Sequence, residues 1–246
     1  MSKRRKPSGM KTGSGRSLKK KNVAIKNIRQ GGFRDLELKF RDSALTEVGF
    51  SGAAALTGGE FDPNYFDGGA TNMLCLNGIA QGDGEEQRDG RRVVLKSIFV
   101  TGYVTQGPLV NQTVGADVGR VILALVHDKQ TNGAQLNSED VFKNPSGSTA
   151  HVAHLVRNLQ YSQRFDVLWK KTYVMPPLPT SYDGTNMEMG ETGIKFKVWR
   201  TLDLPVQFTG TGSTVASIAD NSLHLIAFGS GAGLSLGYNA RVRFIG

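Results

Sequence analysis

RRVVLKSIFVTGYVTQ, residues 91–106, is the stretch of this chain with the strongest strand character. β-Branched and aromatic side chains dominate it, and lysine and threonine are spaced between them, which is the composition that strands favour. The alternation of apolar and polar side chains shifts near Ser97, so a β-bulge is expected there. A Gly-Pro pair follows and ends the predicted strand.

Seven further stretches have strand character, with neither βαβ alternation nor a fixed repeat between them: 33–40, 73–76, 120–126, 164–174, 194–199, 222–228 and 234–245. In the stretch 120–126 every residue after Arg120 is apolar, so both of its faces are expected to be covered. The last two stretches are predicted to form a hairpin across the glycine-rich residues 229–233. Eight antiparallel strands with long connections predict an all-β fold, an eight-stranded antiparallel jelly-roll sandwich.

Helix is expected only in the long connection that follows residue 127. Residues 137–142 read NSEDVF, with a capping Asn or Ser and acidic residues in the first turn. A second short helix is predicted because four apolar residues follow helical spacing, namely Val152, Leu155, Val156 and Leu159. Connections of this length are usually functional or pack against a neighbouring molecule.

The first twenty-nine residues differ from the rest of the chain in charge. They contain no Asp or Glu and eleven basic residues, which are Lys3, Arg4, Arg5, Lys6, Lys11, Arg16, Lys19, Lys20, Lys21, Lys26 and Arg29. The whole chain has 30 Lys and Arg against 21 Asp and Glu, so residue 30 onward holds 30 − 11 = 19 basic and 21 acidic residues, a net charge of −2. The protein is therefore a basic arm attached to a nearly neutral body.

The arm contains too little apolar surface to offset the entropy of ordering its backbone, so it is expected to be disordered when free. A flexible cationic arm on a compact domain is typical of proteins that bind a polyanion, most often nucleic acid. The alternative interpretation is a nuclear localisation signal or a solubilising tail. A nuclear localisation signal is compatible with nucleic-acid binding.

Other features of the sequence limit the cellular compartment and the enzymatic chemistry that are expected. Cys75 is the single cysteine, which excludes an intramolecular disulfide and fits a reducing compartment. The basic N-terminus is not followed by an apolar run, and no stretch approaches 18 consecutive apolar residues, so neither a secretory signal nor a membrane span is expected. The sequence lacks GxxxxGK[ST], and the chain is not expected to be an enzyme.

Two groups of side chains could be taken for metal sites. His151 and His154 have a spacing that two ligands could share, but no CxxC or HExxH accompanies them. Asp62, Asn64 and Asp67 resemble part of a calcium loop without its required Glu and Gly. Neither a metal nor a cofactor is therefore expected.

Two further groups of residues have both a functional and a structural interpretation. Asp128 follows the apolar stretch 120–126, and a role in stabilising the turn is favoured over a catalytic role because no partner base is near in sequence. Phe165, Trp169 and Tyr173 stand beside two lysines, as in a platform on which bases stack. Core packing is favoured for these rings, because aromatic residues at this spacing are common in strands.

Four segments together resemble capsid proteins of small circular single-stranded DNA viruses, the circovirus-like and geminivirus-like group. The segments are GRRVVLKSIFVTGYV (90–104), RVILALVHDKQ (120–130, followed by Asn132-Gly133 and by Asp140 to Phe142), QRFDVLWKK (163–171) and YNARVRF (238–244). Their order and spacing agree with that family, and the basic arm is in its expected place. Two features depart from it. The family often has an acidic residue near Trp169, and circovirus arms are longer and richer in Arg.

The resemblance implies two parts: residues 1–32, a basic nucleic-acid-binding arm with a nuclear localisation signal, and residues 33–246, a jelly-roll capsid shell domain. It implies an icosahedral shell of about sixty copies, with the arm inside and in contact with phosphates. The implied partners are copies of the chain itself, single-stranded nucleic acid, DNA in the first place, and a nuclear import receptor, with no membrane. The implied locations are the virion and, during assembly, the host nucleus.

Two alternatives remain open on the sequence. One is a capsid protein of a small RNA or satellite virus, which only the packaged nucleic acid would distinguish. The other is a cellular jelly-roll protein with a nuclear tail that binds nucleic acid or has a lined pocket. In the capsid interpretation, contacts between copies are expected in the long connections 127–163 and 175–192.

Overall fold

The computed structural model describes residues 37–49, 59–60, 75–106, 120–136, 138–143, 155–176, 180–182, 187–189, 192–230 and 234–246. These residues belong to one compact unit, Leu36–Gly246. The basic arm lies outside the described residues, so the division of the chain at residue 32 stays a prediction.

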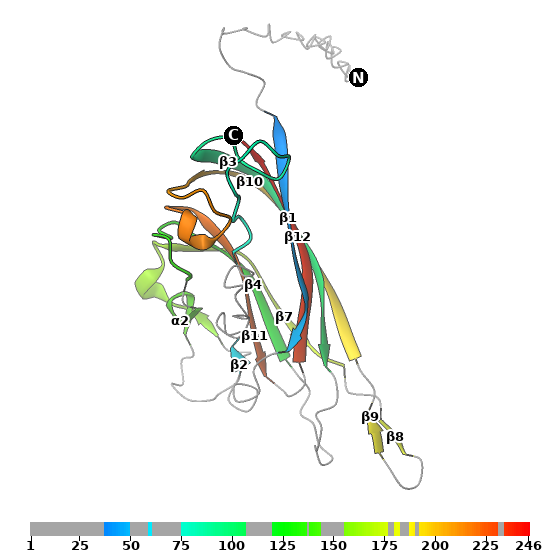
Figure 1. Ribbon diagram of the computed structural model, residues 1–246. Coiled ribbons are helices and arrows are strands. Elements are labelled where there is room, and N and C mark those ends of the chain that lie inside the picture. The colour runs from blue at the N-terminus through cyan, green and yellow to red at the C-terminus, as the bar shows by residue number, and fades with distance from the viewer. Residues whose placement is uncertain are drawn as a thin grey trace, which may run out of the picture. The chain divides into compact units, whose positions relative to one another are not determined.

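Two four-stranded antiparallel sheets pack as a sandwich (Figure 1). The first has the order β1-β12-β3-β10, and the second has the order β2-β11-β4-β7. Their strands are β1 (Leu38–Gly49), β2 (Gly59–Glu60), β3 (Arg92–Gln106), β4 (Arg120–Asp128), β7 (Phe165–Val174), β10 (Thr192–Gln207), β11 (Ser222–Ser230) and β12 (Leu234–Ile245). Counted along the chain, the two orders are 1-8-3-6 and 2-7-4-5, which is the arrangement of a jelly roll. The predicted fold class is confirmed.

The remaining described elements are short. They are the helix α2 (Ser138–Val141), the paired strands β5 (Phe142–Lys143) and β6 (Val156–Arg157), the 3-10 helices η2 (Leu159–Tyr161) and η3 (Val215–Ser217), and the paired strands β8 (Thr180–Tyr182) and β9 (Met187–Met189). The first predicted helix is therefore confirmed as α2. The second is wrong in its described part, because residues 156–161 form β6 and η2 and leave Leu159 78% exposed.

The strand β4 lies between two apolar clusters, as its sequence predicts. Alternate residues from Val121 to Leu125 face the main core between the sheets. The residues between them join a second cluster on the outer side of the sheet, where the segment from Leu136 to Phe142 packs. Both faces of β4 are buried in this way, and every residue from Val121 to Asp128 is buried.

The predicted hairpin of the last two strands is wrong. The strand β11 pairs with β2 and β4, whereas β12 pairs with β1 and β3, so residues 229–233 connect the two sheets. The burial patterns give the physical reason. Described β11 side chains are buried on both faces of their sheet, but β12 alternates buried with exposed side chains from Ala240 to Phe244. The two strands therefore have different surroundings.

The second predicted strand is also misplaced. Of residues 73–76, the described Cys75 forms only an isolated bridge with His224. The strands on either side of β11 are β4 and β2, and β2 lies between residues 40 and 73, where the sequence predicts no strand. The bulge near Ser97 is confirmed, because Arg243 pairs with Ser97 and the next residue, Phe244, pairs with Leu95.

A buried carboxylate joins the end of β4 to the start of β7. Both oxygens of Asp128 accept hydrogen bonds from the Arg164 guanidinium, at 2.9 Å from Nε and 2.8 Å from Nη2. The backbone N–H of Gln130 donates to the same carboxylate at 2.9 Å. Asp128 is fully buried. The turn-stabilising role that the sequence favoured for Asp128 is confirmed.

Replacing Arg164 with Met should destabilise the fold strongly, because it leaves the Asp128 carboxylate buried without a counter-charge. We expect the free energy of unfolding to fall by about 3 kcal/mol or more, measured by urea denaturation of the full chain. Asp203→Ala is the matched control. It removes the exposed Lys96–Asp203 pair and should cost less than about 1 kcal/mol. Equal losses in the two variants would contradict this account.

Candidate nucleic-acid interface

The two sheets differ in what covers their outer faces. Leu136, Val141 and Phe142 pack on the outer face of the sheet β2-β11-β4-β7. Within the described part of the chain, no apolar cluster covers the outer face of the other sheet, where Trp199 is 50% exposed and Tyr103 is 40% exposed. We call this outer face of β1-β12-β3-β10 the open face.

Cross-strand register brings side chains from all four strands into rows across the open face. In the central row, Asp42 of β1 lies opposite Arg241 of β12, Arg241 lies opposite Phe99 of β3, and Phe99 lies opposite Trp199 of β10. The flanking rows contain Phe40, Arg243, Ser97 and Thr201 on one side, and Asn239, Thr101, Lys197, Gly237, Tyr103 and Lys195 on the other. Cations therefore alternate with aromatic rings on this face.

Contacts between neighbouring strands hold the rings and cations together. The ring centres of Phe99 and Trp199 are 6.1 Å apart, with their planes tilted by 52°. The Lys197 Nζ atom lies 5.4 Å from the Phe99 ring centre, and the Arg243 guanidinium lies 6.0 Å from the Trp199 ring centre. These distances are in the range of cation–π contacts, which are weak at exposed sites and leave the cations available to an anion.

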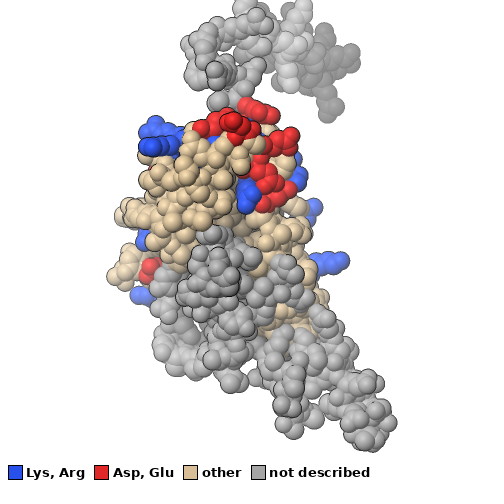
Figure 2. Space-filling view, viewed as in Figure 1, with Lys and Arg blue, Asp and Glu red and all other residues tan. Residues whose placement is uncertain are grey.

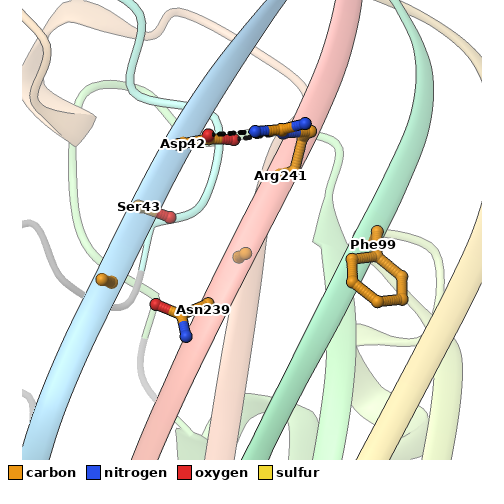
Figure 3. Close-up of a pocket in the computed structure, with 7 residues that line it drawn as sticks. Asp42, Ser43, Phe99, Asn239 and Arg241 are labelled. Atoms are coloured by element: carbon orange, nitrogen blue, oxygen red, sulfur yellow. Dashed lines mark hydrogen bonds and ion pairs between the residues drawn. The ribbon is translucent and has the colours of Figure 1, made fainter.

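The Arg241 cation is matched by a carboxylate. Arg241 donates from Nε and Nη2 to the two Asp42 oxygens at 2.6 Å each (Figure 3). These hydrogen bonds lower the pKa of Asp42 and raise the pKa of Arg241 from their ordinary values. The guanidinium also lies 4.7 Å from the Phe40 ring centre.

Three other cations of the open face have no such partner. Among the ion pairs of the described residues, none includes Lys195, Lys197 or Arg243. All three side chains are exposed. The open face therefore has a local excess of positive charge even though the body as a whole is nearly neutral.

Two shallow hollows lie side by side on the open face and share Phe99 and Arg241. One has a volume of about 390 Å³ and extends over Asp42 of β1 and Asn239 of β12, the strand between β1 and the strand of Phe99 (Figure 3). The other has a volume of about 380 Å³ and is lined by Ser97, Phe99, Lys197, Trp199, Arg241 and Arg243. Both volumes are within the range of sites that hold small organic groups.

Acidic side chains gather elsewhere, at the end of the sandwich where β1 begins (Figure 2). They belong largely to the loop 81–90, which contains Asp83, Glu85, Glu86 and Asp89. Two ion pairs attach this loop to β1, Lys39–Asp89 at 2.6 Å and Arg41–Glu86 at 2.8 Å. This loop therefore gathers four carboxylates at one end of the sandwich.

The eleven arm residues predicted to bind nucleic acid, from Lys3 to Arg29, lie outside the described residues. Their role stays a prediction. Sequence reasoning missed Phe99 and Trp199 as site residues. The signal was present, because the alternation in residues 194–199 places Trp199 on the same face as Lys195 and Lys197.

The aromatic platform considered around Trp169 is part of the core, as the sequence favoured. Phe165 is buried in the outer cluster, and Tyr173 packs against the main core. Trp169 stacks on Phe196 with ring centres 6.5 Å apart and an angle of 23° between the planes. These rings are therefore not arranged as an exposed stacking surface.

The histidines and acids considered as metal ligands, His151, His154, Asp62, Asn64 and Asp67, lie outside the described residues. Among the residues that are described, no group of three or more His, Cys, Asp or Glu side chains could hold a metal ion. No helix in the same part of the chain is long and apolar enough to cross a membrane.

A serine and a histidine of β11 have the contact of a nucleophile and its base, but they are inaccessible. Ser222 Oγ and His224 Nε2 are 2.7 Å apart, and both residues are fully buried. Thr131 Oγ1 donates to Ser222 Oγ at 2.7 Å, which extends the network into the turn after β4. Burial lowers the pKa of His224 to about 4. It also raises the pKa of the nearby Cys75 thiol to about 12. These buried groups hold parts of the core together by hydrogen bonds, and they are not an accessible reactive site.

The buried His224 should make stability fall in mild acid. Its pKa drops from 6.5 to about 4 on folding, so the unfolded chain binds more protons between these values. The contribution of neutral His224 to the free energy of unfolding is complete above pH 6.5. It is lost as the pH falls toward 4, which lowers the free energy of unfolding by about 3 kcal/mol. Urea denaturation at pH 7 and pH 4.5 should show a smaller acid loss in His224→Gln than in the natural chain. The same loss in both proteins would refute this role of His224.

Comparisons with known proteins are sparse. No family model matches the sequence. No curated protein matches it. Among solved structures, the chain is similar to one described as "Crystal structure of 60-mer BFDV Capsid Protein", with 11% sequence identity and a TM-score of 0.26, over 87% of this chain and 94% of that chain.

Proposed function

We propose that this chain is a structural capsid protein that assembles with copies of itself into an icosahedral shell. In this proposal the arm, residues 1–32, packages a single-stranded genome, DNA in the first place. The observation that carries the proposal is a jelly-roll strand order in a chain whose first twenty-nine residues hold eleven cations and no anion. The proposal also agrees with the four segments that resemble capsid proteins.

The charge distribution supports coupling between assembly and genome capture. Cationic arms that are crowded inside a closed shell repel each other unless a polyanion neutralises them. A shell would therefore form most readily around nucleic acid. The clusters from Lys3 to Lys6 and from Lys19 to Lys21 would bind phosphates without reading the base sequence. The same clusters would direct the free chain to the host nucleus before the virion forms.

Contacts between copies require surface that is unfavourable in a monomer. In the connection between β4 and β7, Leu159 is 78% exposed, Val156 is 49% exposed and Tyr161 is also exposed. At the end of β7, Val174 is exposed too. Exposed apolar side chains of this size commonly mark protein–protein contacts. They support the expectation that the connection 127–163 takes part in contacts between copies.

Electron microscopy of the purified full-length chain should show uniform closed particles. Nucleic acid extracted from the particles should be sensitive to deoxyribonuclease and to a nuclease specific for single strands. Ribonuclease sensitivity would shift the proposal to the capsid of an RNA or satellite virus. A chain that stays a monomer or a small oligomer at all concentrations, with or without nucleic acid, would refute the capsid proposal.

The arm should give the binding of single-stranded oligonucleotides a steep salt dependence. If eleven charges contact phosphates, the slope of log K against log salt is about −0.7 × 11, or roughly −8. Replacing Lys3, Arg4, Arg5, Lys6, Lys19, Lys20 and Lys21 with Gln in the full chain leaves four arm charges, and the slope should become about −3. Lys171→Gln, a control at an exposed position of β7 in the sandwich, should leave it near −8. A slope near zero in the natural chain would reject binding through the arm.

A further inference from the structure

We infer that the open face binds single-stranded nucleic acid by stacking bases on Trp199 and Phe99, with phosphates held by Lys195, Lys197 and Arg243. This inference takes its partner from the proposed function, and it adds a second binding surface that is separate from the arm. It also assigns that surface a different kind of contact, because a stacked base is held by its ring and not by its charge.

The first support is the exposure of Trp199. Half of its surface is exposed, and it projects from the middle of a regular strand, whereas the other tryptophan, Trp169, stacks on Phe196 in the core. Large aromatic side chains are usually buried in strands or at interfaces, because water contact with the ring is unfavourable. A partner with flat apolar surfaces would remove the Trp199 ring from water.

The second support is the arrangement of cations around the rings. Lys197 lies against Phe99, and Arg243 lies against Trp199, so a bound base would have a cation close to its own phosphate. Lys195 lies two residues before Lys197 on the same face of β10, about 7 Å away along the strand. Because none of these three cations has a carboxylate partner among the described residues, a phosphate would not have to displace one.

The third support is that the rings continue along the sheet. Tyr103 lies four residues after Phe99 on the same face of β3, and it is 40% exposed. Its ring lies against Gly237 of β12, where an added Cβ would be only 2.8 Å from the Tyr103 Cζ atom. The glycine therefore leaves room for the Tyr103 ring next to β12. Together the rings and cations form a track across β12, β3 and β10.

The chemistry of the track favours single strands. In a duplex the bases are stacked on each other and cannot meet side-chain rings, whereas a single strand offers free base faces. An acidic peptide would also pair with the cations, but it would leave the exposed Trp199 ring in water. The combination of unpaired cations and exposed rings is the pattern by which single strands are bound without sequence preference.

The experiment uses Trp199 as its own reporter. In full-length Trp169→Phe protein, Trp199 is the only tryptophan, because the chain has two. A short oligo-dT should quench its emission, and an oligo-U of the same length should do the same. An abasic strand of that length offers the same phosphates without bases and should bind without strong quenching. Absence of quenching by oligo-dT at saturation would overturn the inference.

Affinity measurements on full-length variants provide the second test, with labelled strands at a salt concentration that weakens the arm. Trp199→Ala should weaken oligo-dT binding by about 5- to 140-fold, the usual range for loss of one stacked base, and should leave abasic-strand binding unchanged. Trp199→Phe should restore most of the loss. Thr209→Ala removes an exposed side chain in the loop after β10 and should have no effect. Equal oligo-dT affinity for the natural chain and Trp199→Ala would refute the inference.

The outcomes separate this inference from the proposed function. If no shells form but Trp199 is quenched by oligo-dT, the open face binds single strands and the capsid proposal fails. If shells form and hold nucleic acid but Trp199→Ala has unchanged oligo-dT affinity, the capsid proposal stands and the role of the open face is refuted. An acidic peptide that competes for the face and also quenches Trp199 would replace nucleic acid as the partner.

Discussion

The burial of β4 on both faces is the constraint on which the rest of the structure depends. Eight consecutive residues, Val121–Asp128, are buried, so the strand must lie inside a sheet that is covered on both sides. Its neighbours β11 and β7 supply the hydrogen bonds. The core between the sheets covers one face, and the segment from Leu136 to Phe142 covers the other. Asp128, at the end of the strand, is stabilised by Arg164 within the same buried region.

Among the described residues, that arrangement leaves the outer face of β1-β12-β3-β10 without an apolar cover. Because β3, β10 and β12 each bury one face in the core, their other faces can carry charge and exposed rings at no cost to packing. Four carboxylates gather instead in the loop 81–90, which is anchored from within by the buried Arg88. Its Nε donates to the Ile79 carbonyl at 3.0 Å, and its guanidinium lies 4.2 Å from the Phe208 ring centre.

The two proposed binding surfaces would respond differently to their surroundings. Binding through the arm depends on the number of phosphates that it neutralises, so it weakens steeply as salt rises. Stacking on the open face depends on contact between flat rings and is much less sensitive to salt. An arm that attracts a strand over a distance and a sheet that holds its bases at short range would therefore act in sequence. The arm would speed encounter, and the sheet would slow release.

The sequence by itself determined the all-β class, the strand at 91–106 with its bulge near Ser97, the two-sided burial of β4 and the separation of charge between arm and body. These properties follow from local periodicity and composition. Only the tertiary structure decided that β11 and β12 belong to different sheets. It alone brought Asp42 to Arg241, which are 199 positions apart in sequence, and Phe99 to Trp199. Such pairs depend on which strands lie side by side, and local patterns along the chain do not specify that choice.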